Sequence, residues 1–176
     1  MTAADHHPGI VETAPLPAPA RLRWADEEAT AACARRMAAS PALRNAFIAL
    51  HGDLGAGKTS FVRHLLRAAG VAGRIKSPTY AVVEPHEVAE PHASWRAWHF
   101  DFYRFDDPHE WDDAGFRDIF AEPGLKLAEW PEKARGVLPP ADLDVVIEVD
   151  EAGVRHARLA AGSAAGAALL KAGAGA

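Results

Sequence analysis

The segment HGDLGAGKTS, residues 51–60, decides the fold of this chain of 176 residues. It matches the phosphate-loop pattern G-x-x-x-x-G-K-[ST]. The apolar run AFIAL, residues 46–50, precedes it and is typical of a strand buried on both faces of a parallel sheet. After Lys58, apolar residues recur at helical spacing as far as Gly70, a typical helix C-cap. The segment therefore has the strand before it and the helix after it that a phosphate loop requires.

The residue types of this loop suit a nucleotide carrying magnesium. Its glycines let the backbone bend so that successive N–H groups point at phosphate oxygens. Lys58 would supply a compact positive charge for the β- and γ-phosphates, and the Thr59 hydroxyl would hold Mg²⁺. We therefore predict ATP and Mg²⁺ as cofactors. Eight consecutive residues are predicted to bind the nucleotide: Asp53, Leu54, Gly55, Ala56, Gly57, Lys58, Thr59 and Ser60.

The order of elements predicts an α/β fold. Strand-like and helix-like segments alternate at first, with one helix expected over residues 107–120. The last two strands, residues 142–150 and 154–160, are separated by a tight turn. We therefore predict a P-loop NTPase-type three-layer sandwich, with a mixed, mainly parallel sheet and an antiparallel C-terminal edge.

Composition divides the chain into one folded region and two tails. Residues 1–20 and 162–176 are rich in Pro, Gly and Ala without a sustained amphipathic period, so we expect a disordered N-terminal tail and a flexible C-terminal tail. Residues 21–161 are expected to form a single P-loop ATPase domain, because domains commonly span about 100–200 residues.

Charge and cysteine content exclude several classes of protein. The formal net charge of −5 gives no overall basic field, so any RNA contact would have to be local. The single cysteine, Cys33, excludes an intrachain disulfide and multi-cysteine metal sites and fits a reducing compartment. Neither a run of about 18 apolar residues nor the residue order of a signal peptide is present. We therefore expect a soluble, cytoplasmic protein that does not associate with membranes.

A phosphate loop needs an acidic partner for Mg²⁺, commonly at the end of a neighbouring apolar strand. Asp101, Glu129 and Glu148 each follow such a strand. Glu148 follows the most apolar one, but the turn just after it favours a solvent-facing position on an antiparallel strand. Asp101 has the alternative of pairing with Arg104, and a period of two places it on the same strand face as His99. Residue types and spacing leave the choice open.

Other nucleotide-dependent activities find less support. The guanine-specifying N-K-x-D motif is absent, and DDAG at 112–115 satisfies D-x-x-G only inside an expected helix, so adenine is the expected base. A small-molecule kinase needs an acceptor pocket and usually an arginine-rich lid. The arginines of ARRM, residues 34–37, instead lie on an expected solvated helix face before the loop.

Four stretches together resemble the bacterial TsaE (YjeE) family, ATPases of tRNA threonylcarbamoyladenosine (t6A) biosynthesis. They are GDLGAGKTS (52–60), SPTYAVVEPHE (77–87), HFDFYRF (99–105) and LAEWPEK (127–133). The likeness runs from about Asp26 to Leu159. It implies a Mg²⁺-dependent ATPase that acts with TsaB and TsaD and meets tRNA only through that complex. TsaD would carry out the transfer, and ATP hydrolysis would reset the complex between turnovers.

The resemblance also implies roles for individual residues. Asp101 and Glu129 match acidic residues implicated in Mg²⁺ binding and hydrolysis, which favours them over Glu148. Thr79 falls in a switch-like loop and is expected to sense the γ-phosphate or metal, whereas Trp130 is expected either beside the nucleotide or at the edge of the core. The expected catalytic residues are thus Glu129, Asp101 and Thr79, and the expected metal ligands are Thr59, Asp101 and Glu129.

Two alternatives remain beside the ATPase hypothesis. The first is an interaction protein clamped by ATP without required hydrolysis, and the second is a P-loop kinase for a small molecule. Small departures from the family pattern, Tyr80 where Phe is common and DIFAEPG at 118–124, leave the nucleotide site intact.

Overall fold

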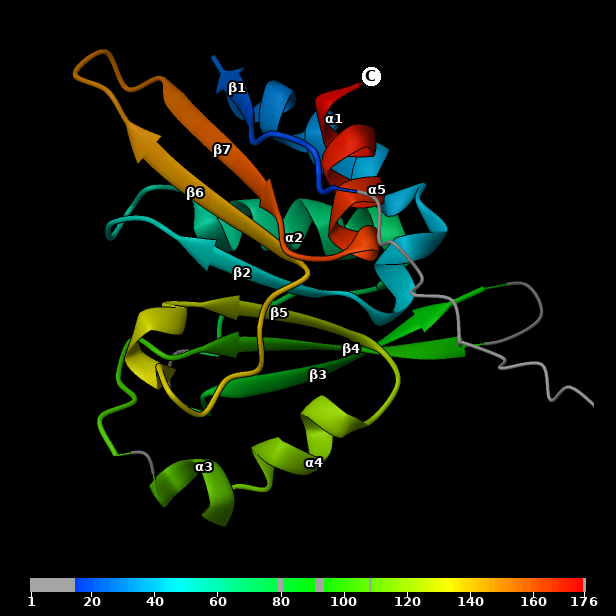
Figure 1. Ribbon diagram of the computed structural model, residues 1–176, viewed down its shortest axis with the longest axis vertical. Helices are drawn as coiled ribbons and strands as arrows, with labels where there is room; N and C mark the ends of the chain where they lie inside the picture. Colours follow the sequence, from blue (N-terminus) through cyan, green and yellow to red (C-terminus); the bar gives the residue numbers. More distant parts are fainter. Residues whose placement is uncertain (1–14, 79–80, 91–93, 108, 176) are drawn as a thin grey trace, which may run out of the picture.

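The computed structural model describes residues 15–78, 81–90, 94–107 and 109–175. Seven strands form one sheet in the order β1-β7-β6-β2-β5-β4-β3 (Figure 1). The strands are β1 (Ala20–Trp24), β2 (Phe47–His51), β3 (Val83–Ala89), β4 (Ser94–Asp101), β5 (Leu125–Glu129), β6 (Leu143–Val149) and β7 (Arg155–Ala161). The α-helices are α1 (Glu27–Ala38), α2 (Lys58–Ala69), α3 (His109–Asp113), α4 (Phe116–Ala121) and α5 (Ala164–Ala174). Short 3₁₀ helices are η1 (Pro41–Asn45) and η2 (Pro131–Ala134).

The sheet is mixed, as predicted, but it is antiparallel at both edges. Strands β6, β2, β5 and β4 pair in parallel in the centre. Strands β1, β7 and β6 pair antiparallel at one edge, and β3 pairs antiparallel with β4 at the other. The second antiparallel edge follows from the short connection between β3 and β4, because parallel neighbours need a crossover of a dozen or more residues.

Helices on both sides give three layers. Helices α1, α2 and α5 contact one another or the strands on one face, whereas α3 and α4 lie apart from them (Figure 1). Strand β2 shows the division: Ile48 and Leu50 belong to one buried cluster, and Phe47 and Ala49 belong to the other. The expectation that AFIAL is buried on both faces is therefore confirmed.

The phosphate-loop unit has the predicted local structure. Strand β2 ends at His51, and α2 begins at Lys58 after a loop in which Gly52, Gly55 and Gly57 have positive φ angles. At Gly52 a Cβ atom would lie 2.3 Å from the carbonyl oxygen of Ile147, so only glycine fits there. The close approach of the loop to β6 therefore depends on that glycine.

One predicted helix is divided into two. The segment 107–120 contains α3 and α4 separated by Gly115, whose φ of 70° lies in the left-handed region that ends a helix. The break lets Trp111 of α3 and Phe116 of α4 both enter the second buried cluster. The prediction of one continuous helix was therefore wrong.

The prediction of a flexible C-terminal tail was also wrong. Residues 164–174 form α5, which Ser163 caps by accepting a hydrogen bond from the Gly166 N–H at 3.1 Å. Leu169 is fully buried, and the helix contacts β6, β7 and α1. Small residues permit this packing but weaken the amphipathic pattern that would reveal it. Of the N-terminal tail, residues 1–14 lie outside the described ranges, and β1 begins at Ala20.

None of the helices within the described ranges has the length and hydropathy needed to span a membrane. The longest of them, α1 and α2, have 12 residues each, whereas a helical membrane span needs about 20.

Truncation of a buried α5 side chain tests whether this helix is part of the core. Leu169→Ala should lower the free energy of unfolding by about 2–5 kcal/mol, because it leaves a cavity in packed surroundings. Urea denaturation measures this value. Lys171→Ala, at an exposed position of the same helix, should change it by less than about 0.5 kcal/mol. Equal stability of the Leu169→Ala and wild-type proteins would show that α5 does not contribute to the core.

Candidate nucleotide-binding site

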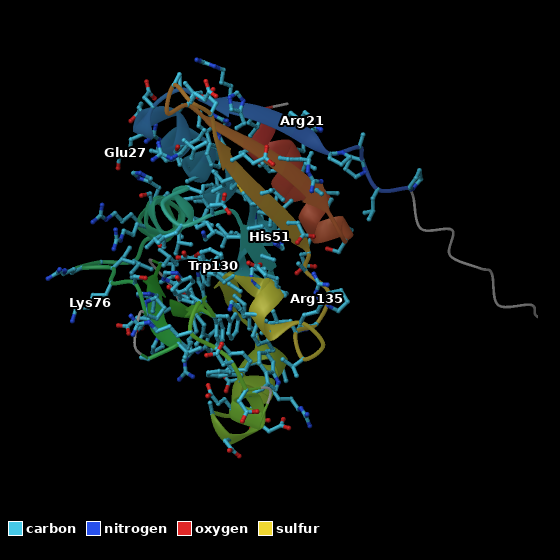
Figure 2. The ribbon with its side chains drawn as sticks, turned by 90° about the vertical axis from the view of Figure 1, so that its left-hand side faces the viewer. Arg21, Glu27, His51, Lys76, Trp130 and Arg135 are labelled. Atoms are coloured by element: carbon cyan, nitrogen blue, oxygen red, sulfur yellow. The ribbon has the colours of Figure 1, made fainter. Side chains whose placement is uncertain are left out.

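A cavity of about 430 Å³ lies where the carboxyl ends of the central strands meet the phosphate loop. The loop and the start of α2 form one wall, and Asp101, Glu129 and Trp130 contribute to the other. Figure 2 labels His51 and Trp130, which directly follow the paired residues Leu50 and Glu129 of β2 and β5. In open α/β sheets ligands bind outside the carboxyl ends of the strands, so this cavity is the candidate site.

Lys58 is folded back onto its own loop. Only 4% of it is exposed, and its Nζ donates to the carbonyl oxygens of Gly52 at 2.5 Å and Asp53 at 2.9 Å. The ammonium also lies 4.0 Å from the ring centroid of Trp130. Burial lowers the pKa of Lys58, and the nearby carboxylate of Glu129 opposes that shift. The lysine is thus a buried cation held by neutral acceptors, which an anionic phosphate would satisfy better.

Glu129 is the central carboxylate of the site. Only 2% of it is exposed, and its two oxygens are bonded to two different elements. The Thr59 hydroxyl of α2 donates to Oε2 at 2.9 Å, and Nε2 of His99, on β4, lies 2.8 Å from Oε1. The structure therefore brings together Thr59 and Glu129, which are 70 positions apart in sequence.

Asp101 lies beside this carboxylate. It pairs with Glu129 across β4 and β5, accepts a hydrogen bond from the Tyr103 N–H at 3.1 Å, and lies 3.4 Å from the Ser77 hydroxyl. Partial burial raises the pKa of Asp101, and the charge of Glu129 adds to that effect, although the Tyr103 hydrogen bond opposes it. The ionised form is thus disfavoured without a cation and would be stabilised by one.

The remaining predicted residues are distributed unequally. Leu54, Gly55, Gly57, Lys58, Thr59 and Ser60 line the cavity. Asp53 contributes its carbonyl to Lys58, and Ala56 contributes its carbonyl to Arg155. Glu148 is exposed on β6 and lines a different hollow with Val146 and His156. Thr79, expected to be a sensor, lies outside the described ranges.

Trp130 occupies both places that the sequence left open. Its side chain lines the cavity and also packs at the margin of the second buried cluster. Its ring centroid lies 5.0 Å from that of Tyr103, which is 46% exposed. Its φ of 57° is uncommon for a non-glycine residue, and such strain is frequent at functional sites.

Several side chains of the site were not among the predicted site residues: Ser77, Tyr103 and Arg104 line the cavity, and His99 and Arg155 make the contacts described next. His99 is fully buried, and within the described residues its Nδ1 has no hydrogen-bond partner. A histidine in an apolar strand, two positions before Asp101, was the signal available for it. Arg155 donates from Nε to the Ala56 carbonyl at 3.0 Å and lines the cavity. No local pattern marks Arg155, because the hairpin of β6 and β7 brings it to the loop from 99 positions away.

The described residues contain no preassembled group of three His, Cys, Asp or Glu side chains that could hold a metal ion. Magnesium is usually bound by one or two carboxylates together with phosphate oxygens and waters, so two adjacent acids and a threonine hydroxyl fit it. Thr59, Asp101 and Glu129 remain the residues expected to hold it.

Strand, loop, helix and mixed sheet together define a fold of the P-loop NTPase type. A family model described as "Threonylcarbamoyl adenosine biosynthesis protein TsaE" matches residues 24–158. The chain belongs to the TsaE family.

Individual relatives agree with this assignment. The protein named "tRNA threonylcarbamoyladenosine biosynthesis protein TsaE" from Haemophilus influenzae is 46% identical over 99 residues, which are 56% of this chain and 60% of that protein. The protein of the same name from Bacillus subtilis is 32% identical over 130 residues, which are 73% and 78% of the two chains. A solved structure, "Crystal structure of Bacillus subtilus YdiB", superposes with a TM-score of 0.68 at 25% identity and covers 88% of this chain and 93% of that one.

Neutralisation of Asp101 separates its effect on binding from its effect on folding. Because the ionised carboxyl is disfavoured in the folded protein, Asp101→Asn should leave the melting temperature of the nucleotide-free protein unchanged or higher. Loss of a ligand should weaken Mg²⁺-ATP binding by about tenfold or more. Calorimetric titration and thermal denaturation measure the two effects. A lower melting temperature with unchanged affinity would assign Asp101 a purely structural role.

A double-mutant cycle measures the contact of His99 with Glu129. His99→Leu should cost about 1–3 kcal/mol of unfolding free energy, since it leaves one oxygen of a buried carboxylate, Oε1 of Glu129, without its partner. In a Glu129→Ala background the same substitution should cost at least about 1 kcal/mol less. His64→Leu is the matched control, because His64 bonds the exposed Glu27 at 3.1 Å and should cost less than about 1 kcal/mol. Equal cost of His99→Leu in both backgrounds would contradict the coupling.

Proposed function

We propose that this chain is a Mg²⁺-dependent ATPase that supports t6A modification of the adenosine beside the tRNA anticodon. It acts with TsaB and TsaD in an ATP-driven assembly and reset cycle, and it meets tRNA only through that complex. The observation that carries the proposal is the buried carboxylate of Glu129 bonded to Thr59 of the phosphate loop at 2.9 Å.

Each residue of the site has a distinct part in this function. Lys58 exchanges its loop carbonyls for phosphate oxygens, and the loop N–H groups bind the same phosphates. Bound magnesium neutralises phosphate charge. Glu129 orients the attacking water through its carboxylate, while His99 holds that carboxylate from the opposite side.

The residues also support a low turnover in the isolated chain. Glu129 is bonded on both oxygens, so it must give up one of these bonds before it can orient a water. The site is open on the side lined by Leu54 and Tyr103, which are 78% and 46% exposed. Hydrolysis benefits from exclusion of water and from added positive charge, and a partner could provide both on that side.

Substitution of Glu129 tests the assignment of hydrolysis. Glu129→Gln keeps the size of the side chain and an oxygen that can accept the bond from Thr59, so the variant should still bind ATP. The rate of phosphate release should fall by about 10²-fold or more, as expected when a group that positions the water is lost. Glu151→Gln, at an exposed position in the turn before β7, is the matched control and should keep the wild-type rate. Wild-type turnover in Glu129→Gln would overturn the role of Glu129.

A partner assay tests the rest of the proposal. Purified TsaB and TsaD should capture the chain with ATP more strongly than with ADP or without nucleotide. A non-hydrolysable ATP analogue should permit about one round of tRNA modification and then arrest it. Repeated rounds with the analogue would instead identify an ATP-clamped interaction protein that needs no hydrolysis.

A further inference from the structure

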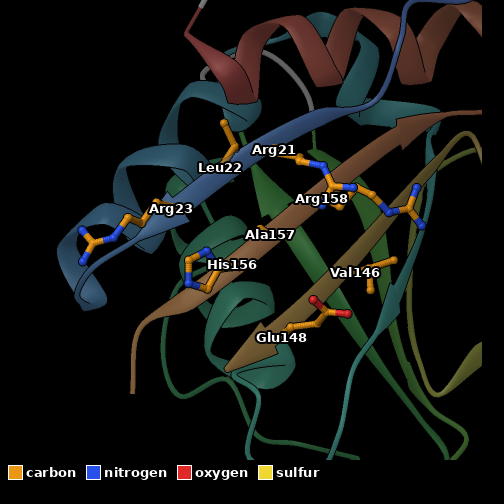
Figure 3. A pocket seen from close by; sticks show the side chains of 8 residues that line it. All are labelled: Arg21, Leu22, Arg23, Val146, Glu148, His156, Ala157 and Arg158. Carbon is orange, nitrogen blue, oxygen red and sulfur yellow. The ribbon is translucent and has the colours of Figure 1, made fainter. Parts of the chain in front are cut away.

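One face of the sheet half formed by β1, β7 and β6 carries charged side chains. The other face of these strands is buried against helices through residues such as Leu22, Val145 and Leu159. Because strand residues alternate between faces, their neighbours project to the opposite side. We name this side the open face, and it lines a hollow of about 310 Å³ (Figure 3). The side chains of the open face that line this hollow are Arg21, Arg23, Val146, Glu148, His156 and Arg158. Leu22 and Ala157, which alternate with them along β1 and β7, complete its lining.

The strand register places like charges opposite each other on the open face. Arg21 pairs directly with Arg158, which is the like-charge pair. Arg23 pairs with His156, whose ring nitrogen lies 2.8 Å from the Asp150 carboxylate. Directly opposed like charges destabilise an antiparallel pair. Within the described ranges, no carboxylate forms an ion pair with Arg21, Arg23 or Arg158. Three such arginines form a local basic area on a chain of net charge −5, which an anionic partner would complement.

The open face continues to the phosphate loop. A second hollow, of about 670 Å³, is lined by Gly52–Ala56 and by residues 146–149, so it shares Val146 and Glu148 with the first. Two exposed aliphatic side chains flank it, Leu54 at 78% and Val149 at 47%. The surface therefore joins a basic area to an apolar one.

The same loop residues serve both the surface and the nucleotide. Gly52 and Asp53 line the second hollow and accept the hydrogen bonds of Lys58. If Lys58 turned to a phosphate, those two carbonyls, which form part of the wall of the hollow, would lose this partner. Arg155, on β7 beside His156 of the open face, is bonded to Ala56 of the same loop. The loop that would bind the nucleotide therefore also forms part of this surface.

We propose that the open face, together with Leu54 and Val149, docks an acidic protein surface with an apolar centre, and that the bound nucleotide controls this docking. The inference rests on the proposed function, whose TsaB–TsaD pair is the partner meant. A protein suits the surface better than an RNA backbone does, because Glu148 in its middle would repel phosphates and the exposed aliphatic residues would contact none.

Neutralising the opposed arginines provides the test. Arg21→Gln/Arg158→Gln removes a like-charge pair, so the variant should keep or exceed the wild-type melting temperature. The dissociation constant for a purified TsaB–TsaD pair, measured with ATP, should rise about tenfold or more and depend less on salt. ATP affinity of the isolated variant should stay within about twofold of wild type. Val149→Ser, outside the nucleotide cavity, provides a second, uncharged probe and should also weaken capture of the pair.

A matched variant controls for net charge. Arg67→Gln/Lys171→Gln makes the same charge change on exposed positions of α2 and α5. It should bind the TsaB–TsaD pair within about twofold of wild type, because long-range attraction is screened beyond about 8 Å. Equal weakening by both double variants would overturn a specific role for the open face.

Other outcomes separate the inference from the function on which it rests. If the wild-type chain fails to bind the pair with any nucleotide, the proposed partner is wrong, and the inference falls with it. If the wild type binds and Arg21→Gln/Arg158→Gln binds equally well, the proposed function stands and the docking surface is overturned. If the isolated chain binds tRNA and this variant abolishes that binding, the surface recognises RNA and the protein assignment is overturned.

Discussion

The buried carboxylate of Glu129 is the constraint on which the arrangement of this site depends. A charge removed from water must be hydrogen-bonded, or folding would protonate or expose it. Its partners come from α2, through Thr59, and from β4, through His99. One side chain at the end of β5 therefore fixes the phosphate-loop helix against two neighbouring strands. The contacts that satisfy this buried charge are the same contacts that hold Glu129 at the candidate nucleotide cavity.

Much of the fold could be predicted, and the failures have physical reasons. Long-range information was unnecessary for β2 and α2, because a buried apolar run, a glycine loop and a C-capped helix are local signals. The helix α5 escaped because its alanines and glycines weaken the amphipathic pattern, although Leu169 is fully buried. The sequence shows a glycine at position 115, but it does not show that the helix breaks there, because a glycine inside a helical pattern is often tolerated.

The residues of the site also divide into those that a local sequence motif predicts and those that depend on contacts between distant parts of the chain. Lys58 and Thr59 are predicted by the phosphate-loop motif, in which the place of each residue indicates its role. Hydrophobicity alone favoured Glu148 among the three candidate acids, because it carries no information on strand order, which puts Asp101 directly beside Glu129. His99 and Arg155 could not be predicted from local sequence. His99 belongs to the site through a contact between neighbouring strands, and Arg155 through the hairpin that returns to the phosphate loop. Resemblance to the TsaE family pointed to the two acids, whereas only the three-dimensional structure revealed His99 and Arg155 as further residues of the site.

The bonds from Lys58 to its own loop have a consequence for selectivity among phosphates. A ligand must replace the two hydrogen bonds that Lys58 Nζ donates, at 2.5 and 2.9 Å, before it can bind this lysine. A single phosphate group brings few oxygens to offset that loss, whereas a chain of phosphates also reaches the loop N–H groups and Thr59. Free phosphate and nucleoside monophosphates, both abundant in cells, would therefore leave the loop closed on itself. The bonds of Lys58 to its own loop therefore set a minimum number of linked phosphates that a molecule must carry to bind at this site.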